Sequence, residues 1–451
     1  MQLDVPSHAR SVLERLDAHG YESYVVGGCV RDSLMGREPK DWDVCTNASP
    51  QEVLAVFRRF HVIKTGLQHG TVTVMSEHLP VEVTTFRLDG CYSDNRHPDS
   101  VTFVSRVEED LSRRDFTINA MAYHPRRGLV DAFGGQEDLT AGLVRCVGEP
   151  DARFQEDGLR ILRALRFASR YGFALERETA YAIHRGRHLL ENISAERIFT
   201  ELKGILVGSG VLDMMLAFPD VFVAVIPEFA PTIGFQQHNP HHCHDVWTHT
   251  AWAVHVSPPD VLLRLALLLH DVAKPACFTQ DEQGRGHFYG HPARGAEMSR
   301  EILHRLKSDN ATLRTVVELV REHDNAFPST RAGMRRLVGR LGEENVRRLI
   351  RIRQADLAAQ SPYRQEEKKE ALRRAALLLE EVLDGTRAFT LKDLNISGGT
   401  LISMGMKPGS ALGKLLTTLL EEVQEEKLEN GSQALQRRAR ELMSSSLAEE
   451  E

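Results

Sequence analysis

Residues 24–45 combine three features that restrict what this chain can fold into. A β-rich run predicts a short strand, the Gly27 and Gly28 pair predicts a tight turn, and a helical pattern follows. Asp41 and Asp43 then stand two positions apart in a second predicted strand. Because side chains alternate along a strand, both carboxylates are expected on one face. The segment therefore predicts a mixed α/β domain with a polar site beside the turn.

The same segment carries groups suited to a nucleoside triphosphate. Gly28 opens a helix whose N–H groups point at one spot, and Arg31 in its first turn adds positive charge. Neighbouring carboxylates repel each other unless a cation lies between them, and hard oxygen ligands favour Mg²⁺. Glu82, in the predicted strand VEVTTF, is a third candidate ligand. We expect Asp41, Asp43 and Glu82 to be catalytic and to hold two Mg²⁺ ions, which would activate a hydroxyl and stabilise a leaving pyrophosphate.

The pattern changes along the chain from mixed to helical. At 451 residues the chain is too long for one ordinary domain. Short β-rich runs alternate with helical patterns at first, whereas long segments of 3.6-residue period dominate later. The predicted fold class is α+β, with a small mixed α/β head followed by an elongated all-helical body. The predicted parts are a catalytic head (1–148), a helical neck (149–235), a separate helical domain (236–330) and a helical body and tail (331–451).

Composition excludes several classes of protein. No stretch approaches the roughly 20 apolar residues of a membrane span, and the first residues lack a signal-peptide layout. The six cysteines are widely spaced, which argues against a disulfide framework and a cysteine zinc site. We expect a cytoplasmic protein without a membrane segment, and the sequence leaves its oligomeric state unknown. The net charge of −7 does not indicate nucleic-acid binding, but arginines cluster at 153–170 and 331–353.

The segment EDGLRILRALRF at 156–167 predicts a helix with one charged face. Asp157, Arg160 and Arg163 are three residues apart, and Arg166 follows. A carboxylate accepts hydrogen bonds from an exocyclic amine, and a guanidinium donates to ring acceptors. Such a pair admits cytosine and adenine and leaves polar groups unpaired against uracil and guanine. The alternative is a solvated arginine stripe stabilised by ion pairs.

These segments resemble the polymerase-β nucleotidyltransferase superfamily, in its class II tRNA nucleotidyltransferase and bacterial poly(A) polymerase branch. The resemblance is dense over the first 205 residues and looser beyond them. Besides the segments above, it rests on three blocks, DLSRRDFTINAMA (110–122), DAFGGQEDLTAGLVR (131–145) and ISAERIFTEL (193–202).

The resemblance implies a polymerase-β-type head and a CCA-adding enzyme that takes tRNA, ATP and CTP. It implies that Asp157 and Arg160 choose the base, that Arg163 and Arg166 lie near the phosphates, and that Arg114 binds the nucleotide. Residues 89–101 resemble the family's flexible loop, which is thought to couple C addition to A addition. The nearest alternative is a poly(A) polymerase or an A-adding enzyme, which shares these motifs. A more remote alternative is a phosphohydrolase.

A second metal site is expected in the helical part. The apolar helix VLLRLALLL delivers His270 and Asp271 at its end, where burying them is costly without a partner. This region resembles the HD domain. The resemblance implies one divalent transition metal on His249, His270, Asp271 and Asp324, with His291 and His323 extending the site in two-metal versions. The alternative is a hydrogen-bonded structural remnant. Hydrolysis of a phosphate ester by metal-activated water would be the corresponding chemistry.

Arginines of the last part are candidate contacts to RNA phosphates, which would give sequence-independent affinity for tRNA. The alternative for any one of them is an exposed arginine on an amphipathic helix. The candidates are Arg335, Arg336, Arg340, Arg347, Arg348, Arg351 and Arg353.

Overall fold

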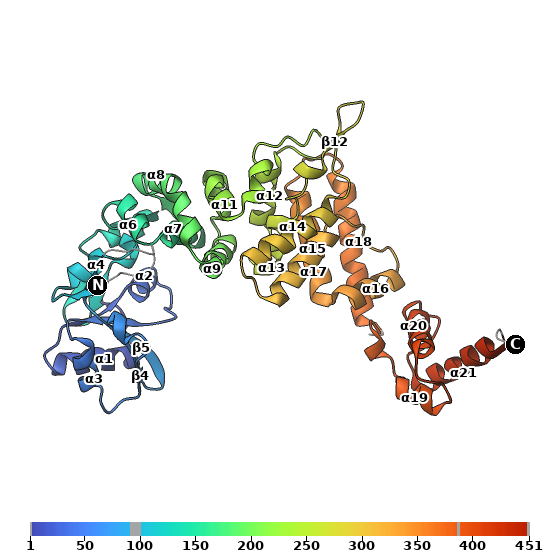
Figure 1. Cartoon of the computed structure of the whole chain (residues 1–451), viewed down its shortest axis with the longest axis horizontal. Helices are drawn as coiled ribbons and strands as arrows, with labels where there is room; N and C mark the ends of the chain where they lie inside the picture. Colours follow the sequence, from blue (N-terminus) through green and yellow to red (C-terminus); the bar gives the residue numbers. More distant parts are fainter. Residues whose placement is uncertain (1, 91–100, 386–387, 449–451) are drawn as a thin grey trace. The chain divides into compact units, whose positions relative to one another are not determined.

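The computed structural model describes residues 2–90, 101–385 and 388–448, which form two compact units (Figure 1). Unit 1 is Met1–Ala230 with Arg305–Lys307, and unit 2 is Pro231–His304 with Ser308–Glu451. The expected flexible loop falls mainly on residues 91–100, which lie outside the described residues. The finer division at residues 148 and 330 stays a prediction.

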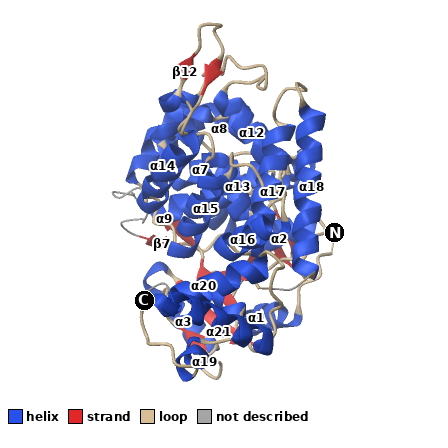
Figure 2. Ribbon diagram, turned by 90° about the vertical axis from the view of Figure 1, so that its right-hand side faces the viewer, coloured by secondary structure: helices blue, strands red, loops and turns tan. Residues whose placement is uncertain are grey.

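The predicted fold class, a mixed α/β head followed by a mostly helical body, is confirmed (Figure 2). A seven-stranded sheet in unit 1 has the order β3-β4-β5-β2-β1-β8-β9. β2 is antiparallel to β1 and parallel to β5. Its strands are β1 (Ser23–Val26), β2 (Asp43–Thr46), β3 (Val62–Ile63), β4 (Thr71–Ser76), β5 (Leu79–Thr85), β8 (Ala122–His124) and β9 (Gly128–Val130).

Alternation of side chains gives this sheet two different faces. Val25 and Val44 join the core beneath α1 (Ser7–Ala18) and α3 (Pro50–Val56), whereas Val26 and Cys45 join a second core with α4 (Val107–Ser112). Ser49 and Glu52 form a reciprocal capping box at the start of α3, ahead of Pro50. The head also contains α2 (Gly28–Leu34), α5 (Gly135–Ala141) and a β6 (Arg87–Asp89) to β7 (Val101–Phe103) pair.

The predicted helix through Asp157 is wrong at its start. α6 (Pro150–Glu156) ends before Asp157, whose backbone is extended, and α7 (Leu159–Tyr171) begins after Gly158. A Cβ at Gly158 would lie 3.0 Å from Leu189, so the close approach of another segment explains the break. Asp157 accepts a hydrogen bond from the Leu159 N–H at 3.0 Å instead. The other elements here are β10 (Leu143–Val144), β11 (Ala174–Leu175), α8 (Arg177–Gly186), α9 (Ala195–Leu206), α10 (Val211–Ala217) and α11 (Pro219–Val225).

Unit 2 is built around a helix that is apolar almost all round. α13 (Val261–Leu269) is buried from Leu263 to Leu269 and packs against α12 (Val246–Val256), α15 (Asn310–Glu322) and α17 (Glu343–Ala358). No helix among the described residues is long and apolar enough to cross a membrane. The remaining elements are β12 (Thr279–Gln280), β13 (Gly286–His287), α14 (His291–Arg305), α16 (Arg331–Leu341), α18 (Gln365–Asp384), α19 (Gly398–Ser403), α20 (Ser410–Gln424) and α21 (Ser432–Ala448).

The arginine-rich helices of unit 2 use most of their charge internally. Arg335 is buried and bonds to the Gln424 carbonyl and to Glu426, both at 2.7 Å. These contacts hold helices together, in line with the structural alternative. Similar ion pairs join Arg340 to Glu322, Arg347 to Glu380, Arg348 to Asp260 and Arg353 to Asp324.

A buried ion pair fastens α7 to the segment before β8. Arg163 donates from Nε and Nη2 to Asp115 Oδ2 at 2.8 and 2.6 Å. Asp115 Oδ1 accepts from Asn119 at 3.0 Å and from the Phe116 N–H at 2.8 Å. Burial alone would raise the pKa of Asp115, but Arg163 and Asn119 lower it to about 2.

Replacing this carboxylate is expected to destabilise the chain in a pH-dependent way. Because the folded pKa lies below an unfolded value of about 3.9, Asp115 stabilises the fold above pH ~4, and this contribution is lost as pH falls towards ~2. Asp115→Asn should therefore reduce the free energy of unfolding by about 2–3 kcal/mol at neutral pH. Urea unfolding of the full chain at several pH values measures this loss.

The exposed pair between Arg185 and Asp151 provides the matched control. Asp151→Asn should change stability by less than about 1 kcal/mol, because solvent screens that pair. Equal losses in the two variants would contradict the special role of Asp115.

Candidate active site and metal centre

Three carboxylates, here called the carboxylate cluster, gather on one face of the sheet: Asp41, Asp43 and Glu82. Asp43 lies directly opposite Glu82 in the parallel β2–β5 pairing, and Asp41 precedes β2 by two residues. All three side chains are exposed, whereas the intervening Trp42 is buried. This is the face turned away from α1 and α3, so the sheet brings the three carboxylates to one side, as their spacing predicts.

The carboxylate cluster is electrostatically unfavourable without a cation. Although Asp43 is solvent-exposed, the surrounding protein partly desolvates its carboxylate, and this, with the charges of Glu82 and Asp41, raises its pKa to about 6. The Arg114 charge opposes this shift. Oxygen donors in a site of excess negative charge fit a hard divalent ion.

The glycine turn and Arg114 lie beside this cluster. Gly27 has a φ of 79°, and its N–H donates to the Met121 carbonyl at 3.0 Å. A Cβ at Gly27 would lie 2.8 Å from Nη1 of Arg114, so glycine is needed both for the backbone and for this approach. Arg114 pairs with Asp110 at 3.4 Å, and its buried Nε makes no hydrogen bond. The Arg114 side chain is 22% exposed, so its positive charge can act on an anion bound beside the turn.

Arg31 is packed more tightly than its predicted role suggests. It is only 5% exposed, pairs with Asp32 at 2.8 Å and hydrogen-bonds to Asn119. Its guanidinium carbon lies 5.2 and 5.1 Å from the ring centroids of Phe167 and Tyr171, which stack on each other. Arg31 thus joins α2 to α7, and direct contact with a triphosphate stays a prediction for both Arg31 and Gly28.

The four residues expected to bind the nucleotide, Asp157, Arg160, Arg163 and Arg166, each form an ion pair within the protein. Asp157 pairs with Arg197 at 2.9 Å, and Arg160 pairs with Glu156 at 2.5 Å, so the two are not bonded to each other. Sequence reasoning missed Arg197, although it lies in the block ISAERIFTEL. The remaining two pairs are Arg163 with Asp115 at 2.6 Å and Arg166 with Glu201 at 2.5 Å.

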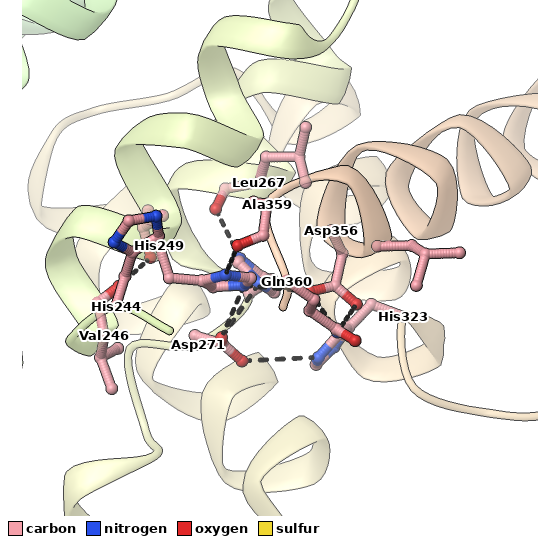
Figure 3. Close-up of polar contacts among 12 residues, drawn as sticks. His244, Val246, His249, Leu267, Asp271, His323, Asp356, Ala359 and Gln360 are labelled. Carbon is pink, nitrogen blue, oxygen red and sulfur yellow. Dashed lines mark hydrogen bonds and ion pairs between the residues drawn. The ribbon is translucent and has the colours of Figure 1, made fainter. Parts of the chain in front are cut away.

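A second group of ligating side chains is buried in unit 2, and Figure 3 shows His249, Asp271, His323 and Asp356 turned towards one another. His249 Nε2 lies 3.0 Å from Asp356 Oδ1 and 3.6 Å from Asp271 Oδ2. His270 Nε2 lies 3.1 Å from Asp271 Oδ2. We call this set, with His291, the histidine–aspartate cluster: His249, His270, Asp271, His291, His323 and Asp356.

The predicted ligand Asp324 lines the cavity beside this cluster but is not among the contacts described above, and its role as a ligand stays a prediction. Its side chain is 59% exposed and pairs with Arg353 at 3.2 Å. Asp356, on α17, lies within the cluster (Figure 3). A signal was available in the sequence, since Asp356 stands at helical spacing from the buried Ile352 and Ala359, where an unpaired carboxylate would be costly.

The two oxygens of Asp271 face two groups of imidazoles. Oδ2 faces His249 and His270, while Oδ1 lies 3.5 Å from His291 Nε2 and 3.8 Å from His323 Nε2. The two imidazoles of the second group are 3.2 Å apart at their Nε2 atoms. Each set of three offers ligand atoms within 4.8 Å of one another. Asp271 is therefore placed to bridge two adjacent cation sites.

Backbone carbonyls fix the orientation of these imidazoles. Nδ1 of His270, His291 and His323 lies 2.6, 2.8 and 2.7 Å from the carbonyls of Leu267, Phe288 and Val320. A carbonyl only accepts, so Nδ1 carries the proton, and in a neutral ring the Nε2 lone pair then turns inward. Burial opposes a charge on His270, but Asp271 raises its pKa above the usual value.

Lone pairs facing carboxylate oxygens favour a cation. Burial lowers the pKa of His323 to about 3, so it stays neutral near pH 7. His270 Nε2 and Asp271 Oδ2 are buried and make no hydrogen bond of good geometry. Lys274 supplies one positive charge, 2.7 Å from Asp271 Oδ2. The donor set of imidazole nitrogens and carboxylate oxygens fits a divalent transition metal.

Three family models match the chain. They are the poly A polymerase head domain over residues 23–145, the probable RNA and SrmB-binding site of polymerase A over 172–217, and a putative tRNA nucleotidyltransferase domain 2 over 293–439. The first covers the carboxylate cluster, and the third covers part of the histidine–aspartate cluster.

Relatives extend over the whole chain. The CCA-adding enzyme of Lactobacillus delbrueckii subsp. bulgaricus is 34% identical over 440 residues, covering 96% of this chain and 97% of that enzyme. This chain belongs to the CCA-adding enzyme family. The CCA-adding enzyme of Geobacillus thermodenitrificans is 50% identical over 200 residues, so that alignment spans 49%, about half, of the relative's length.

Solved structures of the CCA-adding enzyme family share the fold. The crystal structure of the Bacillus stearothermophilus CCA-adding enzyme in complex with CTP is 27% identical, with a TM-score of 0.70 and coverage of 98% of both chains. The predicted resemblance to the polymerase-β superfamily is confirmed by these matches. The HD-domain resemblance and the roles of individual site residues stay predictions.

The raised pKa of Asp43 leads to an expectation for stability. Its folded pKa of about 6 exceeds an unfolded value of about 3.9, so the stabilisation from neutral Asp43 is full below pH ~4 and is lost as pH rises through ~6. Asp43→Asn should therefore unfold at a higher temperature than the parent at pH 8 in EDTA. Added Mg²⁺ should raise the parent's unfolding temperature more than the variant's.

Glu137→Gln, at an exposed carboxylate on α5, is the control and should behave like the parent. A lower unfolding temperature for Asp43→Asn in EDTA at pH 8 would contradict repulsion within the carboxylate cluster.

Proposed function

We propose that this chain is a CCA-adding tRNA nucleotidyltransferase, which adds C, C and A to tRNA 3′ ends from CTP and ATP without a nucleic-acid template. The observation that carries this proposal is the β2–β5 register, which sets Asp43 opposite Glu82 with Asp41 beside them. The full-length relative named a CCA-adding enzyme supports it, as does the related structure with CTP. A related Thermotoga maritima structure is described as complexed with tRNA.

In this proposal the carboxylate cluster holds two Mg²⁺ ions. When bound, the ions would lower the pKa of the attacking 3′-hydroxyl and neutralise charge on the leaving pyrophosphate. Asp41, Asp43 and Glu82 orient them through carboxylate oxygens on one face of the sheet. Arg114, whose side chain is 22% exposed, supplies positive charge for a phosphate oxygen next to the Gly27 turn. The N–H groups at Gly28 contribute further donors to that anion.

Base choice falls to Asp157 and Arg160 in the same proposal. Asp157 accepts from Arg197 and from the Leu159 N–H, and its two oxygens have further lone pairs for an exocyclic amine. Arg197 therefore acts as a positioning residue for Asp157. Arg160 bonds to Glu156 and the Arg113 carbonyl through its Nη atoms. Its Nε–H remains for a ring acceptor.

Extension of tRNA tests this proposal directly. The chain should add C, C and A to tRNA lacking CCA and then stop, as seen on sequencing gels with CTP, ATP or both. Asp43→Asn should reduce the rate of extension by at least 10³-fold, since loss of a metal ligand removes most transition-state stabilisation. Glu137→Gln should extend at the parental rate.

The same assay separates the nearest alternatives. A poly(A) polymerase would extend the primer with A beyond a single addition, and an A-adding enzyme would act on tRNA ending in CC but not on tRNA lacking CCA. Either pattern would overturn C addition while leaving nucleotidyl transfer intact. The proposal also places the chain in the cytoplasm, in keeping with free thiols at Cys29, Cys45, Cys146, Cys243 and Cys277.

We infer a second function for the histidine–aspartate cluster, as a divalent-metal centre of HD type. It is supported by the Nε2 atoms that face Asp271, and by His270 Nε2 and Asp271 Oδ2, which lie buried 3.1 Å apart without hydrogen-bond geometry. A metal held there would supply a water of lowered pKa for hydrolysis of a phosphate ester. Lys274, 2.7 Å from Asp271 and lining the adjoining cavity, adds positive charge for a phosphate.

Substitution of Asp356 or of Asp324 tests which of the two aspartates is a ligand of the metal. Asp356→Asn should lower the transition metal that the chain retains after dialysis by at least tenfold, because Asp356 lies within the cluster. Asp324→Asn should retain the parental amount, since that carboxylate is exposed. Elemental analysis of protein dialysed against Mn²⁺ gives the stoichiometry. Loss on Asp324→Asn with retention on Asp356→Asn would reverse the assignment.

A further inference from the structure

A cavity of about 300 Å³ adjoins the histidine–aspartate cluster. Asp271, His291 and His323 form part of its wall, and Lys274, His287 and Tyr289 form another part. A small ligand in this cavity can therefore contact both the cluster and an aromatic ring. The aromatic side of the cavity has no role in metal binding.

Tyr289 is the aromatic residue with the greatest exposure among the described residues, at 77%. Its ring lies parallel to that of His287, with centroids 5.3 Å apart and an angle of 7°. His287 is held in turn by Asp281, which lies 2.9 Å from its Nε2. One face of the tyrosine ring is thus supported, and the other is open to solvent.

The backbone ties this ring closely to the cluster. Tyr289 precedes His291 by two residues, so their Cα atoms are at most ~7 Å apart. Phe288, between them, packs against Phe278 and His291 and lies beneath the Lys274 ammonium. The segment is therefore anchored on both sides of Tyr289, and its ring is held within a nucleoside's reach of the imidazoles.

We propose that Tyr289 is a specificity-determining residue, which stacks on the base of a nucleoside monophosphate whose phosphate faces Lys274 and the histidine–aspartate cluster. This inference rests on the proposed metal centre. Single exposed aromatic residues are common on protein surfaces. This one differs because His287 and Asp281 hold it in a fixed orientation beside a cavity that carries an ammonium group. A flat, preorganised ring next to an anion site favours a planar base joined to a phosphate.

Binding to the metal-loaded full chain tests the inference. Mn²⁺-loaded protein is titrated calorimetrically with adenosine monophosphate and with ribose phosphate, which lacks a base. Tyr289→Ala should weaken binding of adenosine monophosphate roughly tenfold to a hundredfold, the range expected for one stacked base. Tyr289→Phe should bind it like the parent. Ribose phosphate should bind the parent and both variants equally.

Tyr181→Ala, at another exposed tyrosine that lies in unit 1, is the matched control and should leave both affinities unchanged. Binding of the nucleotide to the head should contribute equally in the parent and in the Tyr289 variants, because residue 289 lies in unit 2. With phosphate release as a second measurement, Tyr289→Ala should raise KM for adenosine monophosphate and leave kcat unchanged.

These outcomes distinguish the stacking role of Tyr289 from the metal centre on which that role depends. Metal uptake with equal affinity for adenosine monophosphate in the parent and in Tyr289→Ala would overturn the stacking role alone. No metal uptake would overturn the metal centre and the stacking role together. Loss of binding in Tyr289→Phe as well would also overturn stacking, since phenylalanine keeps the ring and removes only the hydroxyl.

Discussion

The parallel pairing of β2 with β5 is the constraint on which the rest of the head depends. It sets Asp43 opposite Glu82, with Asp41 two residues away on the same face, so the sheet concentrates negative charge at one place. Partial desolvation by the surrounding protein and these neighbours raise the pKa of Asp43 to about 6. The fold tolerates this repulsion because Arg114 lies beside the Gly27 turn and opposes it. A divalent cation relieves what remains, which makes metal binding and stability of the head parts of one equilibrium.

In the histidine–aspartate cluster, as in the carboxylate cluster, electron-rich atoms are held close together, but here most of the side chains that carry them are imidazoles. The backbone carbonyls of Leu267, Phe288 and Val320 hold three imidazoles so that their Nε2 lone pairs face Asp271. Like the carboxylates of the head, these lone pairs are unfavourably arranged until a cation lies between them. Nitrogen-rich and oxygen-only sets differ in the ions they favour, so one chain is expected to bind a transition metal in unit 2 and Mg²⁺ in unit 1.

Arginine has two roles in this chain, and the sequence pattern does not separate them. Arg163 and Arg335 are committed to buried or half-buried acceptors, and the first of these contacts lowers the pKa of Asp115 to about 2. Arg114 and Arg160 also have partners, and in the proposed function each contacts the nucleotide as well. Because a guanidinium has five donors, one arginine can brace the fold and contact a nucleotide at once. Function then depends on the donors left over rather than on the number of arginines in a stripe.

The sequence by itself determined features that depend on neighbours along the chain. It determined the strand, glycine turn and helix before Asp41, and the delivery of His270 and Asp271 by an apolar helix. Turn-forming residues and helical period are local properties, so the local pattern alone is sufficient. Only the tertiary structure decided that Leu189 approaches Gly158 and breaks the helix at Asp157, and that Asp356 rather than Asp324 meets His249. Those outcomes depend on which distant segments pack together, and that is set by burial of apolar surface across the whole unit, which no local spacing records.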